Sequence, residues 1–189
     1  MHVVTITKTL HVTSRARWRA WLVTHHATEP EIWLVYWRKE TGKARISYND
    51  AVEEALCFGW IDSTQKGIDE QRVAQRFTPR RRVGGLSEMN RQRVRRLAAE
   101  GKMTPAGMAV IGDALEESPV VVAPDVERAL RRDPAAWEHF QGFPEGYRRL
   151  RIAYIEGARD RPEEFAKRLE HFVRRTAKNQ RFGYVKEFR

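Results

Sequence analysis

The sequence predicts an α+β fold: a small, mostly antiparallel sheet with helices in the N-terminal half, followed by an all-helical C-terminal half. Two observations support this. Strand-like runs rich in β-branched and aromatic residues precede residue 80. From Ser87 onward, apolar residues recur at helical spacing behind capping residues. We therefore expect an α+β domain over residues 1–85 and a helical domain over residues 86–189, packed as one compact unit.

The N-terminal half contains alternating strands and helices. The stretch VVTITKTLHV alternates and predicts a strand. Ser14 then caps a helix whose apolar face carries tryptophans. The stretch IWLVYWRK, residues 32–39, predicts a central strand because both of its faces are apolar. A capping box at Ser47–Asp50 begins a second helix, which Gly59 is expected to end.

The segment WIDSTQKGIDEQRVAQRFTP predicts two short strands around a turn at Lys66–Gly67, with Pro79 ending the second strand. A basic connector follows over residues 80–85. The remaining chain predicts helices over residues 87–100 and 104–117, and then in PDVERALRR, DPAAWEHFQG, PEGYRRLRIAYIEGA and DRPEEFAKRLEHFVRRT.

Composition bounds the class of protein. With 41% hydrophobic residues and six tryptophans, the chain can bury a sizeable core. Cys57 is the only cysteine, which excludes an internal disulfide and fits a reducing cytoplasm, where we expect the protein. The first residues lack the pattern of a secretion signal. The longest apolar run, IWLVYW, is far shorter than the roughly 20 residues of a membrane span, so no membrane insertion is expected.

Positive charge is concentrated in one stretch. The formal net charge is +10, and residues 71–110 hold ten basic and two acidic residues, whereas residues 1–70 hold nine of each. Such a stretch can attract anionic ligands or nucleic acid. A solvated basic face without a ligand is the alternative, because the excess of arginine over lysine, 27 to 8, often reflects a GC-rich genome.

Asp62 is the weak catalytic candidate, because it follows Trp60 directly after a predicted helix end. A carboxylate in a cleft can act as a general acid or base. Two structural interpretations compete with this one. In the first, Asp62 accepts backbone N–H groups in a turn; in the second, it pairs with Arg76 or Arg80 across the hairpin. Of the aromatic residues, Trp37 and Trp60 are expected near a surface cleft beside this turn.

The arginines define a second candidate surface. Five flank the hairpin, and Arg91, Arg93, Arg95 and Arg96 are expected to cover a broad exposed side of the next helix. Clustered charge suffices for non-specific polyanion binding. Sequence-specific reading by helix 104–117 is disfavoured because that helix carries only acidic charges. The ligand-binding candidates are Trp37, Trp60, Asp62, Arg76, Arg80, Arg91 and Arg95.

Other chemistry finds little support in the sequence. Cys57 is interpreted as a small buried side chain. The six histidines have no metal-binding spacing, so no metal is expected. The glycine-rich nucleotide loops and the hydrolase elbow are absent from the sequence, and no cofactor is expected.

The stretches EIWLVYWRKETGK, ISYNDAVEEALCFGWIDS, IDEQRVAQRFTPR and LSEMN resemble the bacterial YdeI/OmpD-associated family, also called bacteriocin-protection proteins. The resemblance covers residues from about 14 to about 175, and AAWEHFQGFPEGYRRLRIAYIEGAR resembles the helical module of the family, at about 124–177. One departure is visible, because Gly84 and Leu86 stand where the family usually has serine and tryptophan. If that tryptophan helps to line a ligand site in the family, the replacement puts such a site in doubt here.

The resemblance implies a role in envelope stress or bacteriocin tolerance, and it transfers no reaction or catalytic residue. Three functional hypotheses follow. The first is a non-enzymatic binding protein that uses the GWIDS turn and the arginines of residues 72–96 for an anionic ligand. The second is an enzyme acting on an anionic small molecule, with Asp62 as acid or base and Arg76 or Arg80 holding the anion. The third is a non-specific nucleic-acid binder.

Overall fold

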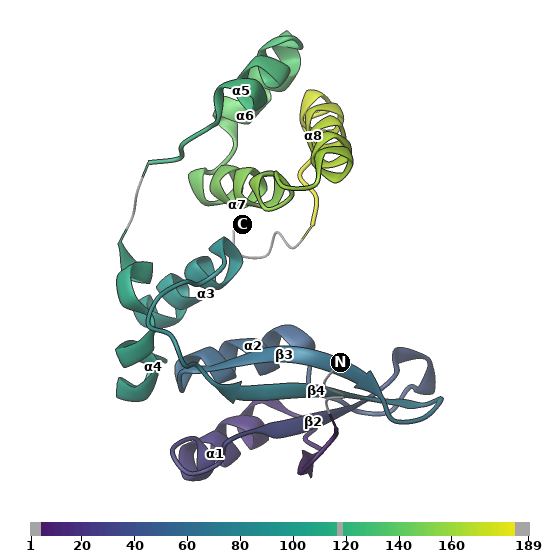
Figure 1. The fold of residues 1–189 in the computed structure, drawn as a ribbon, viewed down its shortest axis with the longest axis vertical. Helices are drawn as coiled ribbons and strands as arrows, with labels where there is room; N and C mark the ends of the chain where they lie inside the picture. Colours follow the sequence, from purple (N-terminus) through teal and green to yellow (C-terminus); the bar gives the residue numbers. More distant parts are fainter. Residues whose placement is uncertain (1–4, 117–118, 184–189) are drawn as a thin grey trace. The chain divides into compact units, whose positions relative to one another are not determined.

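The computed structural model describes residues 5–116 and 119–183 and divides the chain into two compact units (Figure 1). The first unit comprises Met1–Leu86 and Arg93–Leu115, and the second comprises Ser87–Gln92 and Glu116–Arg189. The first unit holds a four-stranded mixed sheet with helices, and the C-terminal region is all-helical. The predicted α+β class is confirmed.

The sheet has the strand order β1-β2-β4-β3, formed by β1 (Thr9–Leu10), β2 (Ile32–Trp37), β3 (Trp60–Gly67) and β4 (Arg72–Pro79). β1 pairs in parallel with β2, and the other pairs are antiparallel. The sheet is therefore mostly antiparallel, with β2 in an inner position as predicted. The first strand is much shorter than the alternating stretch predicts, and part of that stretch lies outside the described residues.

The β3–β4 turn falls at residues 68–71, later than the predicted turn at Lys66–Gly67. The Asp69 carboxylate fixes its position, because it accepts hydrogen bonds from the backbone N–H groups of Gln71 and Arg72 at 2.9 and 2.7 Å. An aspartate that bonds the backbone two or three residues ahead is a common turn device.

Within the first 115 residues, the α-helices are α1 (Arg15–His25), α2 (Tyr48–Cys57), α3 (Glu88–Ala99) and α4 (Pro105–Val110). The 3₁₀ helices η1 (Lys39–Thr41) and η2 (Gly112–Leu115) lie in the same part of the chain. The predicted caps Ser14, Ser47 and Thr104 each accept a backbone N–H. Gly59 has φ +75° just beyond α2, as expected for a helix stop. The helix predicted over residues 104–117 is shorter, since α4 ends at Val110.

The core of the first unit lies between the sheet and the helices α1 and α2, which share one side of the sheet (Figure 1). Trp18 is fully buried there and donates its indole N–H to the Ala51 carbonyl at 3.0 Å. Ile32 and Phe77 are paired neighbours on β2 and β4, and both belong to this core. Since side chains alternate along a strand, Arg76 projects from the opposite face.

α4 approaches α2 closely enough to exclude a side chain at Gly107. A Cβ added there would lie 2.2 Å from the Cys57 carbonyl oxygen. That oxygen also accepts hydrogen bonds from the backbone N–H and the hydroxyl of Thr104. Cys57 is therefore enclosed, and its burial raises the pKa of the thiol. This agrees with the interpretation of Cys57 as a buried side chain.

The second unit contains α5 (Pro124–Arg131), α6 (Pro134–Gly142), α7 (Glu145–Glu156) and α8 (Pro162–Ala177), all at predicted positions. Their apolar faces meet in a core that includes Leu130, Phe140, Ile155 and Phe172. Across the described ranges, no helix is long and apolar enough to cross a membrane.

Candidate functional site

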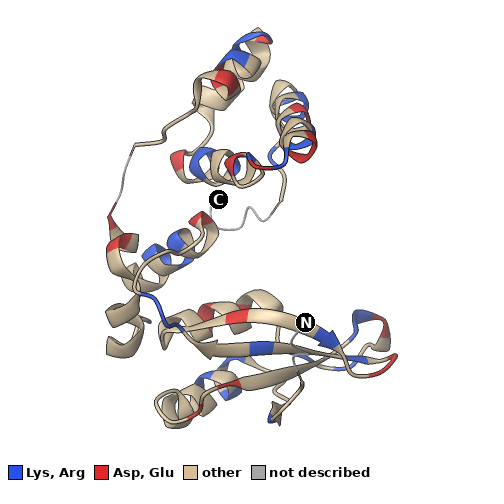
Figure 2. Cartoon of the chain, viewed as in Figure 1, with Lys and Arg blue, Asp and Glu red and all other residues tan. Residues whose placement is uncertain are grey.

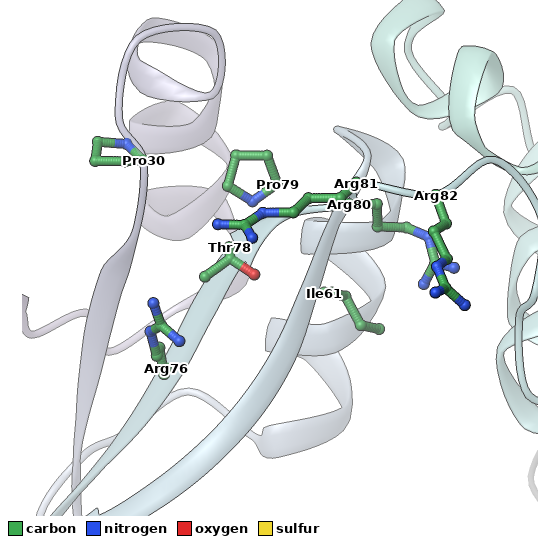
Figure 3. Close-up of a pocket in the computed structure, with 8 residues that line it drawn as sticks. All are labelled: Pro30, Ile61, Arg76, Thr78, Pro79, Arg80, Arg81 and Arg82. Atoms are coloured by element: carbon green, nitrogen blue, oxygen red, sulfur yellow. The ribbon is translucent and has the colours of Figure 1, made fainter. Parts of the chain in front are cut away.

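A cavity of about 600 Å³ lies at the end of β4, and we call it the arginine cavity (Figure 3). It is lined by Pro30, Ile61, Arg76, Thr78, Pro79, Arg80, Arg81 and Arg82. The connector after β4 supplies three of its arginines, and this segment stands out as basic in Figure 2. The predicted candidates Arg76 and Arg80 are thus brought to one cavity.

Strand alternation and a bent connector explain this grouping. Ile61 and Thr78 are register partners on β3 and β4, and Thr78 projects to the same face as Arg76, two residues earlier. The Arg80 N–H donates to the Gly59 carbonyl at 2.9 Å, which continues the pairing past Pro79. The Arg80 guanidinium then donates from Nη2 to the Gly84 carbonyl at 2.7 Å. This bond holds the side chain against its own connector.

The charges around the cavity are unbalanced. Arg76 is neutralised by Glu31, with Nε 2.8 Å from Oε2. Among the described residues, no carboxylate lines the cavity or forms an ion pair with Arg80, Arg81 or Arg82. Burial lowers the pKa of Arg80, and its buried Nε has no hydrogen-bond partner within the described ranges. The cavity therefore presents positive charge that the described part of the chain does not compensate.

Asp62 lies in a separate cavity of about 410 Å³, which we call the tyrosine cavity. It is lined by Tyr36, Arg45, Tyr48, Asp62, Ser63, Gln65, Val73 and Gln75. The Tyr48 hydroxyl donates to the Asp62 carboxylate at 2.6 Å. Asp62 is the register partner of Phe77, so it belongs to the sheet face opposite to that of Arg76.

This placement bears on two predicted arrangements. The structure does not bring Asp62 together with Arg76 or Arg80, as the enzyme hypothesis and the cross-hairpin pair both require. Arg76 pairs with Glu31 instead. The reason is register, because the residue that pairs with Asp62 across the hairpin is Phe77, which is one position beyond Arg76.

The two tryptophan candidates lie outside both cavities. Trp60 is 1% exposed and donates its indole N–H to the His26 carbonyl at 3.0 Å, so it is a core residue. Trp37 is partly buried at the end of β2. The ammonium of Lys43 lies 3.6 Å from the Trp37 ring centroid, and the Arg72 guanidinium lies 5.6 Å from it. Cations of the chain already occupy the surroundings of that ring.

The sequence predicts that the arginines of α3 cover a broad exposed side of the helix, and the structure does not show this. Arg93 is 6% exposed and donates to the Asn49 side-chain oxygen at 2.7 Å. Arg96 pairs with Glu53, with Nη2 2.6 Å from Oε1. Arg91 and Arg95, which are ligand-binding candidates, are half-buried and have partners of their own. Arg93 is buried because it lies beside Val94 and Leu97, the buried apolar residues of α3.

The partner of Arg96 belongs to a feature that the sequence interpretation missed, the buried pair Glu53 and Glu54 on α2. These residues are 4% and 2% exposed. Arg15 binds both carboxylates, and Arg19 binds Glu54 with Nη1 2.7 Å from Oε2. One signal in the sequence could have revealed the pair, because AVEEALCF places two glutamates inside an otherwise apolar helix.

Metal binding has no visible site in the described residues, since no three His, Cys, Asp or Glu side chains cluster there. Leu86, at the position of the family departure, is 7% exposed within the core of the first unit. That position serves packing in this chain.

The fold and the site geometry define an α+β protein that has the arginine cavity and the tyrosine cavity in its first unit and an all-helical C-terminal module. Residues 10–110 match the family model described as "Domain of unknown function (DUF8412)". Residues 119–179 match the model described as "Bacteriocin-protection, YdeI or OmpD-Associated". The chain therefore belongs to the family of the first model and carries the YdeI/OmpD-associated domain of the second. No curated protein and no solved structure matches the chain.

Proposed function

We propose that the chain is a non-enzymatic binding protein that holds a small anionic ligand in the arginine cavity. One observation carries the proposal. Arg80, Arg81 and Arg82 line a single cavity in which no described residue contributes a carboxylate. A guanidinium presents donors in a fixed fork that matches phosphate and carboxylate oxygens. The ligand would supply the counter-charge that the described part of the chain does not.

The number of arginines favours a ligand with more than one anionic group. Arg80, Arg81 and Arg82 each bring a guanidinium that no described carboxylate neutralises, so the lining offers more than one position for an anionic group. Arg80 donates one hydrogen bond, from Nη2, to the Gly84 carbonyl, so its buried Nε is available to a ligand. A diphosphate or a dicarboxylate can reach two such positions at once, whereas a single small anion satisfies only one.

Nucleic-acid binding is the weaker candidate. It requires a long basic surface that tracks a phosphate backbone. Arg93 is buried and Arg96 is neutralised by Glu53, which shortens the basic surface expected from the sequence. The proposed function also includes a role in bacteriocin tolerance, which the family description suggests, or in envelope stress, which the sequence resemblance implies. A cytoplasmic location is part of the proposal and rests on the single cysteine.

Calorimetry on the full chain with sodium pyrophosphate and inorganic phosphate tests the proposal. We expect pyrophosphate to bind more tightly than phosphate. Arg80→Gln and Arg82→Gln should each weaken pyrophosphate binding by about tenfold, the usual effect of losing a charged hydrogen bond. Arg17→Gln is the matched control, because it removes the same charge from an exposed position on α1.

Two outcomes would overturn the proposal. The first is the absence of pyrophosphate binding, or an equal loss in all three variants. The second concerns single-stranded DNA. If an oligonucleotide binds with a steep salt dependence, and Arg17→Gln weakens it as much as Arg80→Gln does, non-specific nucleic-acid binding replaces the anion site.

A further inference from the structure

We propose that the tyrosine cavity is a second ligand site, independent of the arginine cavity, and that it takes a neutral polyhydroxylated molecule such as a sugar. The proposal rests on the geometry of its lining residues. Tyr36 brings a buried hydroxyl without a partner, and Asp62 and Arg45 bring one charge of each sign.

The Tyr36 hydroxyl is the central observation. Tyr36 is 4% exposed, and no described group forms a hydrogen bond with its hydroxyl. Buried polar atoms in folded proteins nearly always have a partner, so an unpaired one marks a place where a partner belongs. Burial, with smaller contributions from Tyr48 and Asp62, raises the pKa of Tyr36. The hydroxyl therefore stays protonated near neutral pH and can donate to a ligand oxygen.

The surrounding polar side chains are held in place by the protein itself. Tyr48 donates to Asp62 at 2.6 Å. The Gln75 amide donates to the Ser63 carbonyl at 3.0 Å, and Arg45 donates to the Trp37 carbonyl at 3.2 Å. These bonds use one donor of each side chain and leave further donors and acceptors for a ligand. A site held in this way loses little freedom when a ligand binds.

The β3 strand contributes an irregularity at the same place. The register between β3 and β4 shifts between Asp62 and Gln65, and Ser63 lies within that shift. Bulges of this kind bend a strand and redirect its side chains, and they are frequent next to binding sites. Here the bulge lies between two side chains of the cavity lining.

The charge balance selects the class of ligand. Asp62 and Arg45 carry the only formal charges in the lining, one negative and one positive. A phosphate would meet the Asp62 carboxylate, and an ammonium group would meet the Arg45 guanidinium. A hydroxyl group both donates and accepts, so neighbouring hydroxyls on one ring can serve Asp62, Arg45 and Tyr36 together. The volume of about 410 Å³ lies in the range of small-molecule pockets.

Ligand-observed NMR on the full chain tests the site, with D-glucose, D-ribose, myo-inositol and sucrose as probes at millimolar concentration. We expect saturation transfer to at least one probe. Tyr36→Phe and Asp62→Asn should each weaken its binding by about tenfold or more, because each removes a hydrogen bond to the ligand. Tyr154→Phe is the matched control, since this tyrosine is exposed on α7.

A stability measurement separates lost binding from lost folding. Tyr36→Phe should keep or raise the melting temperature of the ligand-free chain, because the hydroxyl it removes has no described partner. The proposal is wrong if no probe binds, if Tyr36→Phe binds like the wild type, or if Tyr36→Phe lowers the melting temperature. Sodium phosphate and glycine are the contrasting probes, and Tyr36-dependent binding of either would overturn the neutral class. Pyrophosphate binding should be unchanged in Tyr36→Phe, so the two sites can fail separately.

Discussion

Two groups of arginines in the first unit differ in what faces them. Arg15, Arg19 and Arg96, the paired arginines, surround the buried carboxylates Glu53 and Glu54. Arg80, Arg81 and Arg82, the cavity arginines, line a cavity to which the described part of the chain contributes no carboxylate. Both groups count equally toward the net charge of the sequence. The comparison teaches that missing counter-charge, and not the density of arginine, marks a candidate binding surface.

The difference has a physical origin. A carboxylate is expensive to bury unless it is paired and hydrogen-bonded. Glu53 and Glu54 are buried with α2, so the paired arginines are a structural requirement. The cavity arginines are not needed to pair a buried carboxylate. Arg81 and Arg82 are exposed on the connector, where water solvates them and where a ligand can replace that water.

Removing a buried carboxylate should give the largest effect. Glu54→Gln leaves Arg15 and Arg19 without their common partner, and breaking a buried pair in this way typically costs about 3 kcal/mol. Urea denaturation should report that loss in the free energy of unfolding. Glu100→Gln is the control, because Glu100 forms exposed pairs with Arg96 and Lys102, and should cost less than about 1 kcal/mol. Equal losses would show that the two kinds of pair do not differ.

Neutralising the cavity arginines should change ligand response more than stability. In the double variant Arg81→Gln, Arg82→Gln, the melting temperature in chloride buffer should stay the same or rise slightly, because repulsion between like charges decreases. The added stabilisation that pyrophosphate gives the wild type should fall, since it depends on ligand affinity. Arg15→Gln should behave in the opposite way, with a lower melting temperature and an unchanged pyrophosphate response. If the two variants behave alike, the division into paired and cavity arginines fails.

Much of the fold could be predicted because it depends on local sequence patterns. The capping residues Ser14, Ser47 and Thr104 predict helix starts, and the apolar run of residues 32–37 predicts the inner strand. Those signals involve residues within a few positions of each other. The mostly antiparallel sheet and the helical second half follow from them.

The sites could be predicted only in part, because they depend on partners distant in the chain. Arg15 meets Glu53 across 38 positions, and Arg76 meets Glu31 across 45. The pattern of residues 32–39 predicts only apolar strand faces, and nothing local reveals that the Tyr36 hydroxyl has no hydrogen-bond partner among the described residues. The sequence makes Asp62 a candidate, and the register of the β3–β4 pair, which the sequence does not reveal, decides which cavity it lines. The boundary at residue 85 and the packing into one compact unit stay predictions.

The tyrosine cavity adds a third case to the comparison of carboxylates and arginines. Its carboxylate, Asp62, accepts a hydrogen bond from the Tyr48 hydroxyl, whereas Glu53 and Glu54 are paired with arginines. Tyr48 is half-exposed, yet burial and the hydrogen bond to Asp62 raise its pKa to about 12. A raised folded-state pKa contributes stability that is complete below about pH 10, the ordinary tyrosine pKa, and is lost as the pH rises toward 12. The ultraviolet difference absorbance between the wild type and Tyr48→Phe should isolate the ionisation of Tyr48 in that window from that of the other tyrosines. Asp62→Asn should lower this pKa, and an unchanged titration would contradict the proposed bond.

The smallest effect is expected at an exposed pair in the second unit, Asp125 with Arg159. The side chains are 40% and 45% exposed, and the carboxylate oxygens lie 2.8 and 3.1 Å from the guanidinium. The hydrogen bond from Arg159 lowers the pKa of Asp125 to about 2. The depressed pKa means that the pair contributes stability above about pH 4, and that the contribution is lost as the pH falls toward 2.

Water and salt screen such a pair, so its contribution should be well below that of Glu54. Urea denaturation of Asp125→Asn and the wild type should differ slightly at pH 7 in low salt, and the difference should shrink in high salt and as the pH falls from about 4 toward 2. Glu54→Gln should keep most of its deficit in high salt, because a buried pair is poorly screened. If the Asp125 effect equals that of Glu54, burial is not what separates the paired arginines from surface charge.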